Sequence, residues 1–173
     1  MRELRLLALE GLPEVAAGDD LCALLLAAIA RNGLALADRD ILVIAQKIVS
    51  KAEARAVRLS EIEPSARALE LAATTRKDAR LVECMLRESS AVLRARTHVL
   101  IVEHRLGCVI ASAGIDQSNV PGADAETVLL LPEDPDATAR RLQQQMQQAS
   151  GKRIGIVIND SFGRAWRNGV TGT

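Results

Sequence analysis

Aromatic side chains are almost absent from this sequence of 173 residues, which contains one Phe, one Trp and no Tyr. Proteins that hold single-stranded nucleic acid stack its bases on aromatic side chains, so the composition argues against that class of function. Hydrophobic residues still make up 49% of the chain, and the core must therefore be built from Leu, Ala, Val and Ile. This composition and length are typical of one globular domain, or of one large and one small lobe.

Net charge is also absent, because 22 Lys and Arg residues balance 22 Asp and Glu residues. Such a chain has no overall field that would attract DNA or anionic lipid. The first residues mix both signs of charge and lack the apolar segment of a signal peptide, and no apolar run is long enough to span a membrane. We therefore expect a cytoplasmic protein with no nucleic-acid or membrane partner.

Cysteine pairs with metal-binding or redox spacing are missing as well. The three cysteines, Cys22, Cys84 and Cys108, are far apart and lie in apolar surroundings, which predicts buried free thiols in a reducing compartment. The glycine-rich P-loop and dinucleotide-binding motifs are also missing, so a phosphate site would have to be built in another way.

The hydrophobic pattern predicts an irregular succession of strands and helices. Two apolar runs, residues 99–102 and 107–111, are separated by a short polar turn and are expected to form an antiparallel hairpin. Asp19 or Asp20 precedes one predicted helix, and Pro135 opens another. We therefore predict an α+β fold, with a mixed sheet and flanking helices. The other predicted strands are 4–9, 41–45, 128–131 and 154–158, and the predicted helices are 21–29, 64–73, 78–89 and 135–150.

The two histidines, His98 and His104, lack a partner at metal-ligand spacing and have no Ser or Cys neighbour that would indicate a nucleophilic triad. We expect His104 to be solvated in the hairpin turn and His98 to lie at a strand edge. Arg94 and Arg96 are expected to form a solvated basic edge. No residue is therefore assigned to covalent catalysis.

Polar clusters follow three of the predicted strands, where ligand sites of α/β-type proteins commonly form. Carboxylate and hydroxyl oxygens suit Mg²⁺ or Mn²⁺, and lysine offers a compact positive charge to a phosphate group. The clusters therefore indicate a site for a hard cation and a phosphate. Its candidate residues are Gln46, Lys47 and Lys51 after residues 41–45, Asp116 and Asn119 after residues 107–111, and Asp160 and Ser161 after residues 154–158.

Each cluster taken alone is also compatible with an ordinary turn, because Asp and Asn commonly form turns after strands. Two carboxylates 4 Å apart repel by roughly 4 kcal/mol at an effective dielectric constant of 20. If Asp116 and Asp160 converge, a cation between them is the simplest explanation. The sequence leaves their convergence open.

Six segments are characteristic in combination: LPEV at residues 12–15, GDDL at 18–21, AQKIVSKAE at 45–53, GIDQSNV at 114–120, LLPEDPD at 130–136 and NDSFGR at 159–164. With these segments the chain resembles the coenzyme F420:L-glutamate ligases, or F420-0 gamma-glutamyl ligases, essentially from end to end. The resemblance implies the α+β fold of that family and a homodimer.

The resemblance also implies an activity. GTP would phosphorylate the terminal carboxylate of a deazaflavin coenzyme precursor, and the amine of L-glutamate would then displace phosphate from the acyl phosphate. Mg²⁺ or Mn²⁺ would be required, and K⁺ would contribute. This chemistry needs positive charge around phosphate oxygens and little covalent work by the protein.

Matching by position gives the site residues that the resemblance implies. Asp116 and Asp160 would bind one divalent metal ion, and Ser161 would bind a second. The nucleotide would be bound by Leu12, Pro13, Glu14, Val15, Gln46, Lys47, Lys51 and Asn119.

Members of the family continue beyond the segment that matches residues 164–169. Residues 1–173 are therefore expected to be the N-terminal portion of a gamma-glutamyl ligase-like domain, without the family's C-terminal segment. Two alternatives to a complete ligase stay open. One is a truncated, non-catalytic homologue that binds nucleotide or metal, and the other is an interaction module that uses the glutamine-rich stretch 143–148.

Overall fold

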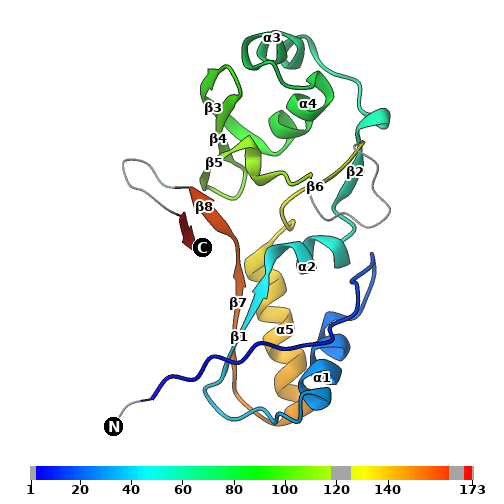
Figure 1. Cartoon of the computed structure of the whole chain (residues 1–173), viewed down its shortest axis with the longest axis vertical. Coiled ribbons are helices and arrows are strands. Elements are labelled where there is room, and N and C mark those ends of the chain that lie inside the picture. The colour runs from blue at the N-terminus through cyan, green and yellow to red at the C-terminus, as the bar shows by residue number, and fades with distance from the viewer. Residues whose placement is uncertain (1–2, 118–125, 164–169, 173) are drawn as a thin grey trace.

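The computed structural model describes residues 3–117, 126–163 and 170–172. Within these ranges the chain forms two halves, each built around its own hydrophobic cluster (Figure 1). The chain starts in the lower half of the figure, crosses to the upper half near residue 55, and returns near residue 131. Both halves contain helices together with strands that pair into small sheets, so the predicted α+β class is confirmed.

The lower half packs helices against one face of a parallel pair of strands. Ile44 and Ile158 lie opposite each other in that pair, and Val49 and Met146 are fully buried beneath it. Asp20 opens the first helix, because its carboxylate accepts a hydrogen bond from the Ala23 N–H at 3.1 Å. The elements of this half are α1 (Leu21–Arg31), β1 (Ile41–Ala45), α2 (Gln46–Ala52), α5 (Pro135–Ser150) and β7 (Gly155–Asn159).

The upper half places two helices against an antiparallel sheet with the strand order β3-β4-β5. A separate antiparallel pair, β2 with β6, continues toward the lower half. The elements are β2 (Ala56–Arg58), the 3-10 helix η1 (Leu59–Glu61), α3 (Ala66–Thr75), α4 (Ala79–Arg87), β3 (Ser89–Arg96), β4 (Val99–His104), β5 (Val109–Ala111), the 3-10 helix η2 (Ser112–Gly114) and β6 (Thr127–Leu129).

A last hairpin lies where the two halves meet. β8 (Ser161–Gly163) follows β7 directly and pairs antiparallel with β9 (Val170–Gly172). β8 lies beside β5 of the upper half (Figure 1). The end of β7 is thereby brought to the upper sheet, which places sequence-distant polar residues around one junction.

Most of the predicted helices and strands are confirmed, and α5 has the predicted boundaries 135–150. The strand predicted for residues 4–9 is wrong: this segment pairs with no other strand of the described chain, and Leu4 and Leu6 are 84% and 87% exposed. The helix predicted for residues 78–89 ends at Arg87, and β3, which was not predicted, starts at Ser89.

His104 is completely buried, so the prediction of a solvated turn histidine is wrong. The reason is that β4 extends through His104, and alternate residues of a strand point to the same face. Leu100 and Val102 on that face are also buried, and His104 therefore joins them. Its Nδ1 accepts a hydrogen bond from the Leu106 N–H at 3.1 Å, which leaves Nε2 as the protonated nitrogen.

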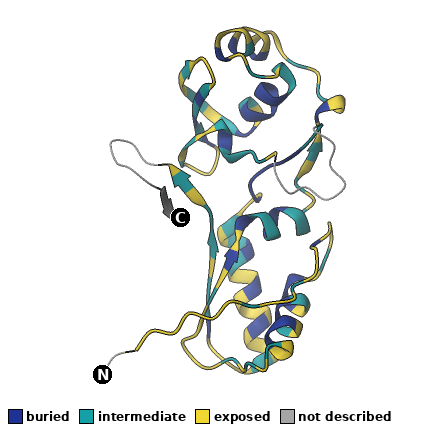
Figure 2. Cartoon of the chain, in the orientation of Figure 1, coloured by how far each residue is buried: buried dark blue, intermediate teal, exposed yellow. Residues whose placement is uncertain are grey.

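One face of the β1–β7 pair carries exposed residues, although parallel strands are usually covered on both faces (Figure 2). Ile41, Val43 and Val157 are 66%, 61% and 42% exposed.

No helix in the described residues is long and apolar enough to cross a membrane.

The cysteines are free thiols, as predicted. Cys22 and Cys84 are buried, and Cys108 is half-buried. Burial raises the pKa of all three thiols, so the neutral form is favoured in each.

Candidate functional site

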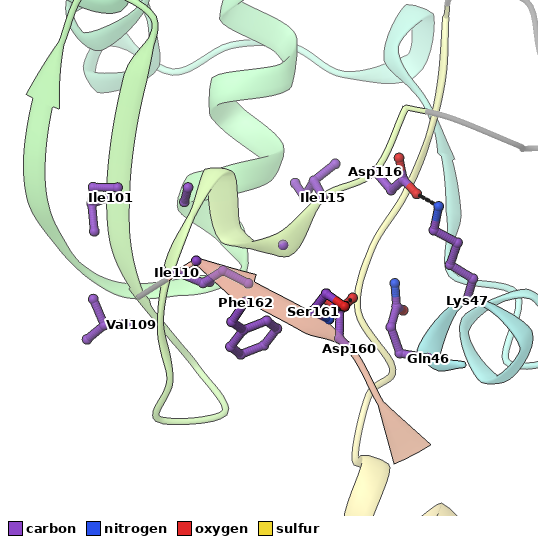
Figure 3. A pocket seen from close by; sticks show the side chains of 13 residues that line it. Gln46, Lys47, Ile101, Val109, Ile110, Ile115, Asp116, Asp160, Ser161 and Phe162 are labelled. Atoms are coloured by element: carbon purple, nitrogen blue, oxygen red, sulfur yellow. Dashed lines mark hydrogen bonds and ion pairs between the residues drawn. The ribbon is translucent and has the colours of Figure 1, made fainter. Parts of the chain in front are cut away.

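A pocket of about 640 Å³ lies at the junction of the two halves (Figure 3). Three of the polar clusters predicted from the sequence reach it, from α2, from the segment after η2, and from the start of β8. The opposite wall is apolar and comes from β4 and β5. The lining residues are Gln46, Lys47, Ile101, Val109, Ile110, Ala111, Gly114, Ile115, Asp116, Asp160, Ser161, Phe162 and Gly163.

Helix α2 carries the first cluster because it begins directly where β1 ends. Gln46 is 6% exposed, and its Oε1 accepts a hydrogen bond from the Ser50 hydroxyl at 2.9 Å, one helical turn away. This bond fixes the amide so that its N–H groups remain as donors. The next residue, Lys47, extends into the junction (Figure 3).

Asp116 is fixed by its backbone and its carboxylate together. Its N–H donates to the Leu129 carbonyl at 3.0 Å, and its own carbonyl accepts from the Leu129 N–H at 2.8 Å. Its Oδ2 forms an ion pair with the Lys47 ammonium (Figure 3). The structure thus joins a predicted metal-binding carboxylate in the upper half to a predicted nucleotide-binding lysine in the lower half.

Asp160 reaches the pocket because it follows the last residue of β7. Its Oδ1 accepts a hydrogen bond from the N–H of the next residue, Ser161, at 2.8 Å. Burial raises the pKa of the neighbouring Cys108 thiol, and the negative charge of Asp160 adds to this shift. Asp160 is the single residue between β7 and β8, so the chain makes no turn there and the turn interpretation is wrong for this residue.

The donor set fits a hard divalent cation. Asp116, Asp160 and Ser161 contribute carboxylate and hydroxyl oxygens to one pocket, and Lys47 brings a positive charge to its edge. In the described part of the chain, no group of three or more His, Cys, Asp or Glu side chains is arranged to hold a metal ion by itself. Mg²⁺ commonly takes one or two protein carboxylates and completes its shell with water and substrate phosphates, so the set is suitable for that ion.

Other predicted nucleotide-binding residues lie outside this pocket. Lys51, near the other end of α2, has its Nζ 3.7 Å from Oε1 of Glu14. Pro13 and Glu14 are exposed, whereas Leu12 and Val15 contribute to the hydrophobic cluster of the lower half. Asn119 lies outside the described residues. The predicted nucleotide site is therefore divided between the junction pocket and a second group around Lys51.

Phe162 and the apolar wall were missed by sequence reasoning. Phe162 lines the junction pocket and also an adjoining apolar pocket of about 370 Å³, which Cys108 lines as well. Ile101 and Val109 come from paired strands of the upper sheet. The alternation of the hairpin strands was the only available signal, and it cannot identify the sequence-distant surface that a strand faces.

We expect Gly114→Ala to destabilise the protein by about 2 kcal/mol, because it adds a Cβ at a strained position. Gly114 has a φ of +65°, and an added Cβ would lie 2.9 Å from the Leu131 side chain. Chemical denaturation of both proteins measures the loss. Gly151→Ala is the matched control: its φ is +69°, but no atom lies within 4 Å of the added Cβ. An equal loss in both variants would contradict the role of the Leu131 contact.

Comparison with known proteins supports the resemblance. Residues 11–173 match the family described as F420-0:Gamma-glutamyl ligase. The chain is 44% identical over 167 residues to the coenzyme F420:L-glutamate ligase of Methanothermobacter thermautotrophicus, covering 96% of this chain and 65% of that protein.

Two further proteins with the same name are similarly related. The one from Methanopyrus kandleri is 42% identical, with 92% of this chain and 60% of that protein covered. The one from Archaeoglobus fulgidus is 41% identical, with 94% and 62% covered. The chain thus spans 60–65% of the length of these relatives. The extent of the match shows that the chain belongs to the F420-0:Gamma-glutamyl ligase family.

Proposed function

We propose that the chain takes part in the GTP-dependent ligation of L-glutamate to the terminal carboxylate of a deazaflavin coenzyme F420 precursor. The observation that carries this proposal is the junction pocket, in which Lys47, Asp116 and the adjacent Asp160 and Ser161 come together from three sequence-distant segments. These are the residue types that phosphoryl transfer requires. Family membership and the names of the relatives support L-glutamate and an F420 precursor as substrates.

The proposed reaction has two steps. An oxygen of the precursor carboxylate attacks the γ-phosphorus of GTP, which forms an acyl phosphate and releases GDP. The amine of L-glutamate then attacks the acyl carbon, so that an amide bond forms and phosphate and a proton are released. Bringing the reactants together in one pocket accounts for much of the acceleration expected of such a site.

The side chains of the pocket have separate tasks in this reaction. Lys47 supplies positive charge at the phosphate oxygens, and the amide of Gln46, held by Ser50, donates hydrogen bonds. Phe162 and the apolar wall exclude water, which protects the acyl phosphate from hydrolysis. Asp116, Asp160 and Ser161 would hold Mg²⁺ or Mn²⁺, which when bound neutralises the charge of the phosphate oxygens.

The proposal is tested by incubating the purified chain with the precursor, L-glutamate, GTP and Mn²⁺ in the presence and absence of K⁺. We expect a glutamylated product and one GDP per amide bond, with a higher rate when K⁺ is present. ATP in place of GTP is the matched control and should give little product. GTP binding by calorimetry without any product would instead support a non-catalytic homologue that binds nucleotide. The absence of both binding and product would overturn the proposal.

We also propose a homodimer that covers the exposed face of the β1–β7 pair. Ile41, Val43 and Val157 form an apolar surface on that face, and a second copy of the chain would remove it from water. Light scattering should give the mass of two chains, and Val43→Glu should give the mass of one. Glu103→Gln, a charge change on a different sheet, should remain dimeric. A monomeric parent protein would contradict the homodimer.

We also propose a place in the cytoplasm, because a reducing compartment keeps cysteines as free thiols.

A further inference from the structure

Two main-chain segments connect the halves and lie side by side (Figure 1). Residues 53–55 leave the lower half, residues 130–134 return to it, and the Leu130 N–H donates to the Arg55 carbonyl at 3.1 Å. Asp116 belongs to the upper half, whereas Asp160 follows β7 of the lower half. The path of these two segments, together with the contact of β8 with β5, therefore determines how the two carboxylates lie relative to each other.

Glu88, directly after α4, is the centre of a buried charge cluster beside these segments. Its residue is 8% exposed, and its Oε2 accepts hydrogen bonds from Nη2 of Arg55 at 2.7 Å and Nε of Arg105 at 3.0 Å. Nε2 of His104 lies 3.5 Å from the same oxygen and has no hydrogen-bond partner among the described residues. A single carboxylate oxygen thus attracts two guanidinium groups and one buried imidazole.

Both guanidinium groups also hold the returning segment. Nε of Arg55 donates to the Leu131 carbonyl at 2.9 Å. Arg105 donates from Nη2 to the Pro132 carbonyl at 3.2 Å and from Nη1 to the Glu133 carbonyl at 2.6 Å. Three successive carbonyl groups are therefore fixed by arginines that Glu88 orients, and the planar guanidinium groups suit such multiple contacts.

The two ends of the returning segment lead to the two carboxylates. At its start, Leu129 is hydrogen-bonded in both directions to Asp116. At its end, Asp134 caps α5 by accepting from the Ala137 N–H at 2.8 Å, and α5 packs against β7, which leads into Asp160. A shift of residues 131–133 would therefore change the position of Asp116 relative to Asp160.

We infer that Glu88 is a positioning residue that fixes the relative placement of the two halves, and with it the placement of Asp116 relative to Asp160. Glu88 does not line the junction pocket, so it acts through Arg55, Arg105 and residues 131–133. Without the negative charge of Glu88, the guanidinium groups of Arg55 and Arg105 would repel each other and move apart, because no carboxylate would hold them together. The consequence for catalysis rests on the proposed function, whereas the placement of the halves does not.

Distances between two spin labels test the placement directly. Labels are attached at Leu69→Cys on α3 and Gln144→Cys on α5, both exposed, in a Cys108→Ser background in which the remaining native thiols are buried. We expect one narrow distance distribution for the parent and a distribution at least twice as wide for Glu88→Gln. Glu83→Gln is the matched control, because Glu83 lies on α4 and pairs with Arg87 at 2.9 Å, away from residues 131–133. Glu83 also accepts a hydrogen bond from the Ser65 N–H at 3.0 Å, which the side-chain oxygen of Gln can still accept. Its distribution should equal that of the parent.

Arg105→Gln provides a second variant should Glu88→Gln fail to fold, because the Arg105 side chain is 32% exposed. It removes the contacts to Pro132 and Glu133 and should also widen the distribution. In an active preparation, Glu88→Gln should raise the Mn²⁺ concentration for half-maximal rate by roughly tenfold or more, as changes behind metal ligands commonly do. Folded variants at both positions with the narrow parental distribution, or equal widening in Glu83→Gln, would overturn the inference. The distances need no substrate, so an inactive parent protein would refute the proposed function and leave this test intact.

Discussion

Replacing Asp116 by Asn is expected to weaken Mn²⁺-dependent GTP binding by about 100-fold, which corresponds to roughly 2.7 kcal/mol of binding free energy. The neutral amide of Asn keeps the shape of the side chain but removes one of the two pocket carboxylates and its ion pair with Lys47. Affinity of oxygen sites for divalent ions depends strongly on the number of charged ligands. Calorimetry with GTP at fixed Mn²⁺ measures the loss.

The same substitution should leave the free energy of unfolding nearly unchanged. The Lys47 and Asp116 side chains are 36% and 22% exposed, and partly solvated ion pairs typically contribute only about 0–1 kcal/mol. The backbone hydrogen bonds between Asp116 and Leu129 do not depend on the side chain. Glu103→Gln, which removes one negative charge elsewhere in the upper half, should bind GTP as the parent does. Parental Mn²⁺ and GTP affinity in Asp116→Asn would show that this carboxylate does not bind the metal.

Acidification should remove on the order of 3 kcal/mol of stability through Glu88 alone. Burial by itself would raise the pKa of the Glu88 carboxyl above its value of 4.5 in an unfolded chain. The nearby His104, the hydrogen bond and charge of Arg55, and the charge of Arg105 have the opposite effect and lower this pKa to about 2. A carboxyl with a lowered pKa in the folded state stabilises the fold above its unfolded pKa. That contribution is lost as the pH falls from about 4.5 toward about 2.

Urea denaturation at pH 7, 4.5, 3.5 and 2.5 measures this contribution. Other lowered carboxyls, those of Asp78 and Glu83, contribute to the acid sensitivity of the parent as well. The comparison is therefore made with Glu88→Gln, which should be less stable than the parent at pH 7 and lose the difference as the pH falls. Curves for the two proteins that remain parallel down to pH 2.5 would contradict the lowered pKa of Glu88.

Local structure followed well from local patterns. Asp134 and Pro135 at one end and Gly151 at the other predicted α5 with its observed bounds, because capping residues act on the backbone groups next to them. β1 was predicted from a short β-branched run for a similar reason. Residues 4–9 have an equally apolar pattern but form no strand in the described chain, because a strand also needs a partner that its own sequence does not specify.

The residue types at the strand ends also predicted a shared site, and the structure places Lys47, Asp116 and Asp160 around one pocket. What the residue types did not reveal was the direction of each side chain. His104 was expected in water and is buried beside Glu88, and the role of Glu88 was not foreseen. Its partners Arg55 and Arg105 are 33 and 17 residues away in the sequence.

The sequence by itself determined the capped helices, the strand cores, the hairpin, the free thiols and the polar residues that follow the strands. Only the tertiary structure decided that Lys47 meets Asp116, that Lys51 instead lies near Glu14, and that Phe162 lines the junction pocket. Helix caps and turns depend on neighbours a few residues apart, which a sequence displays directly. Contacts between the halves depend on how the chain crosses from one to the other, and that path results from the packing of both hydrophobic clusters together.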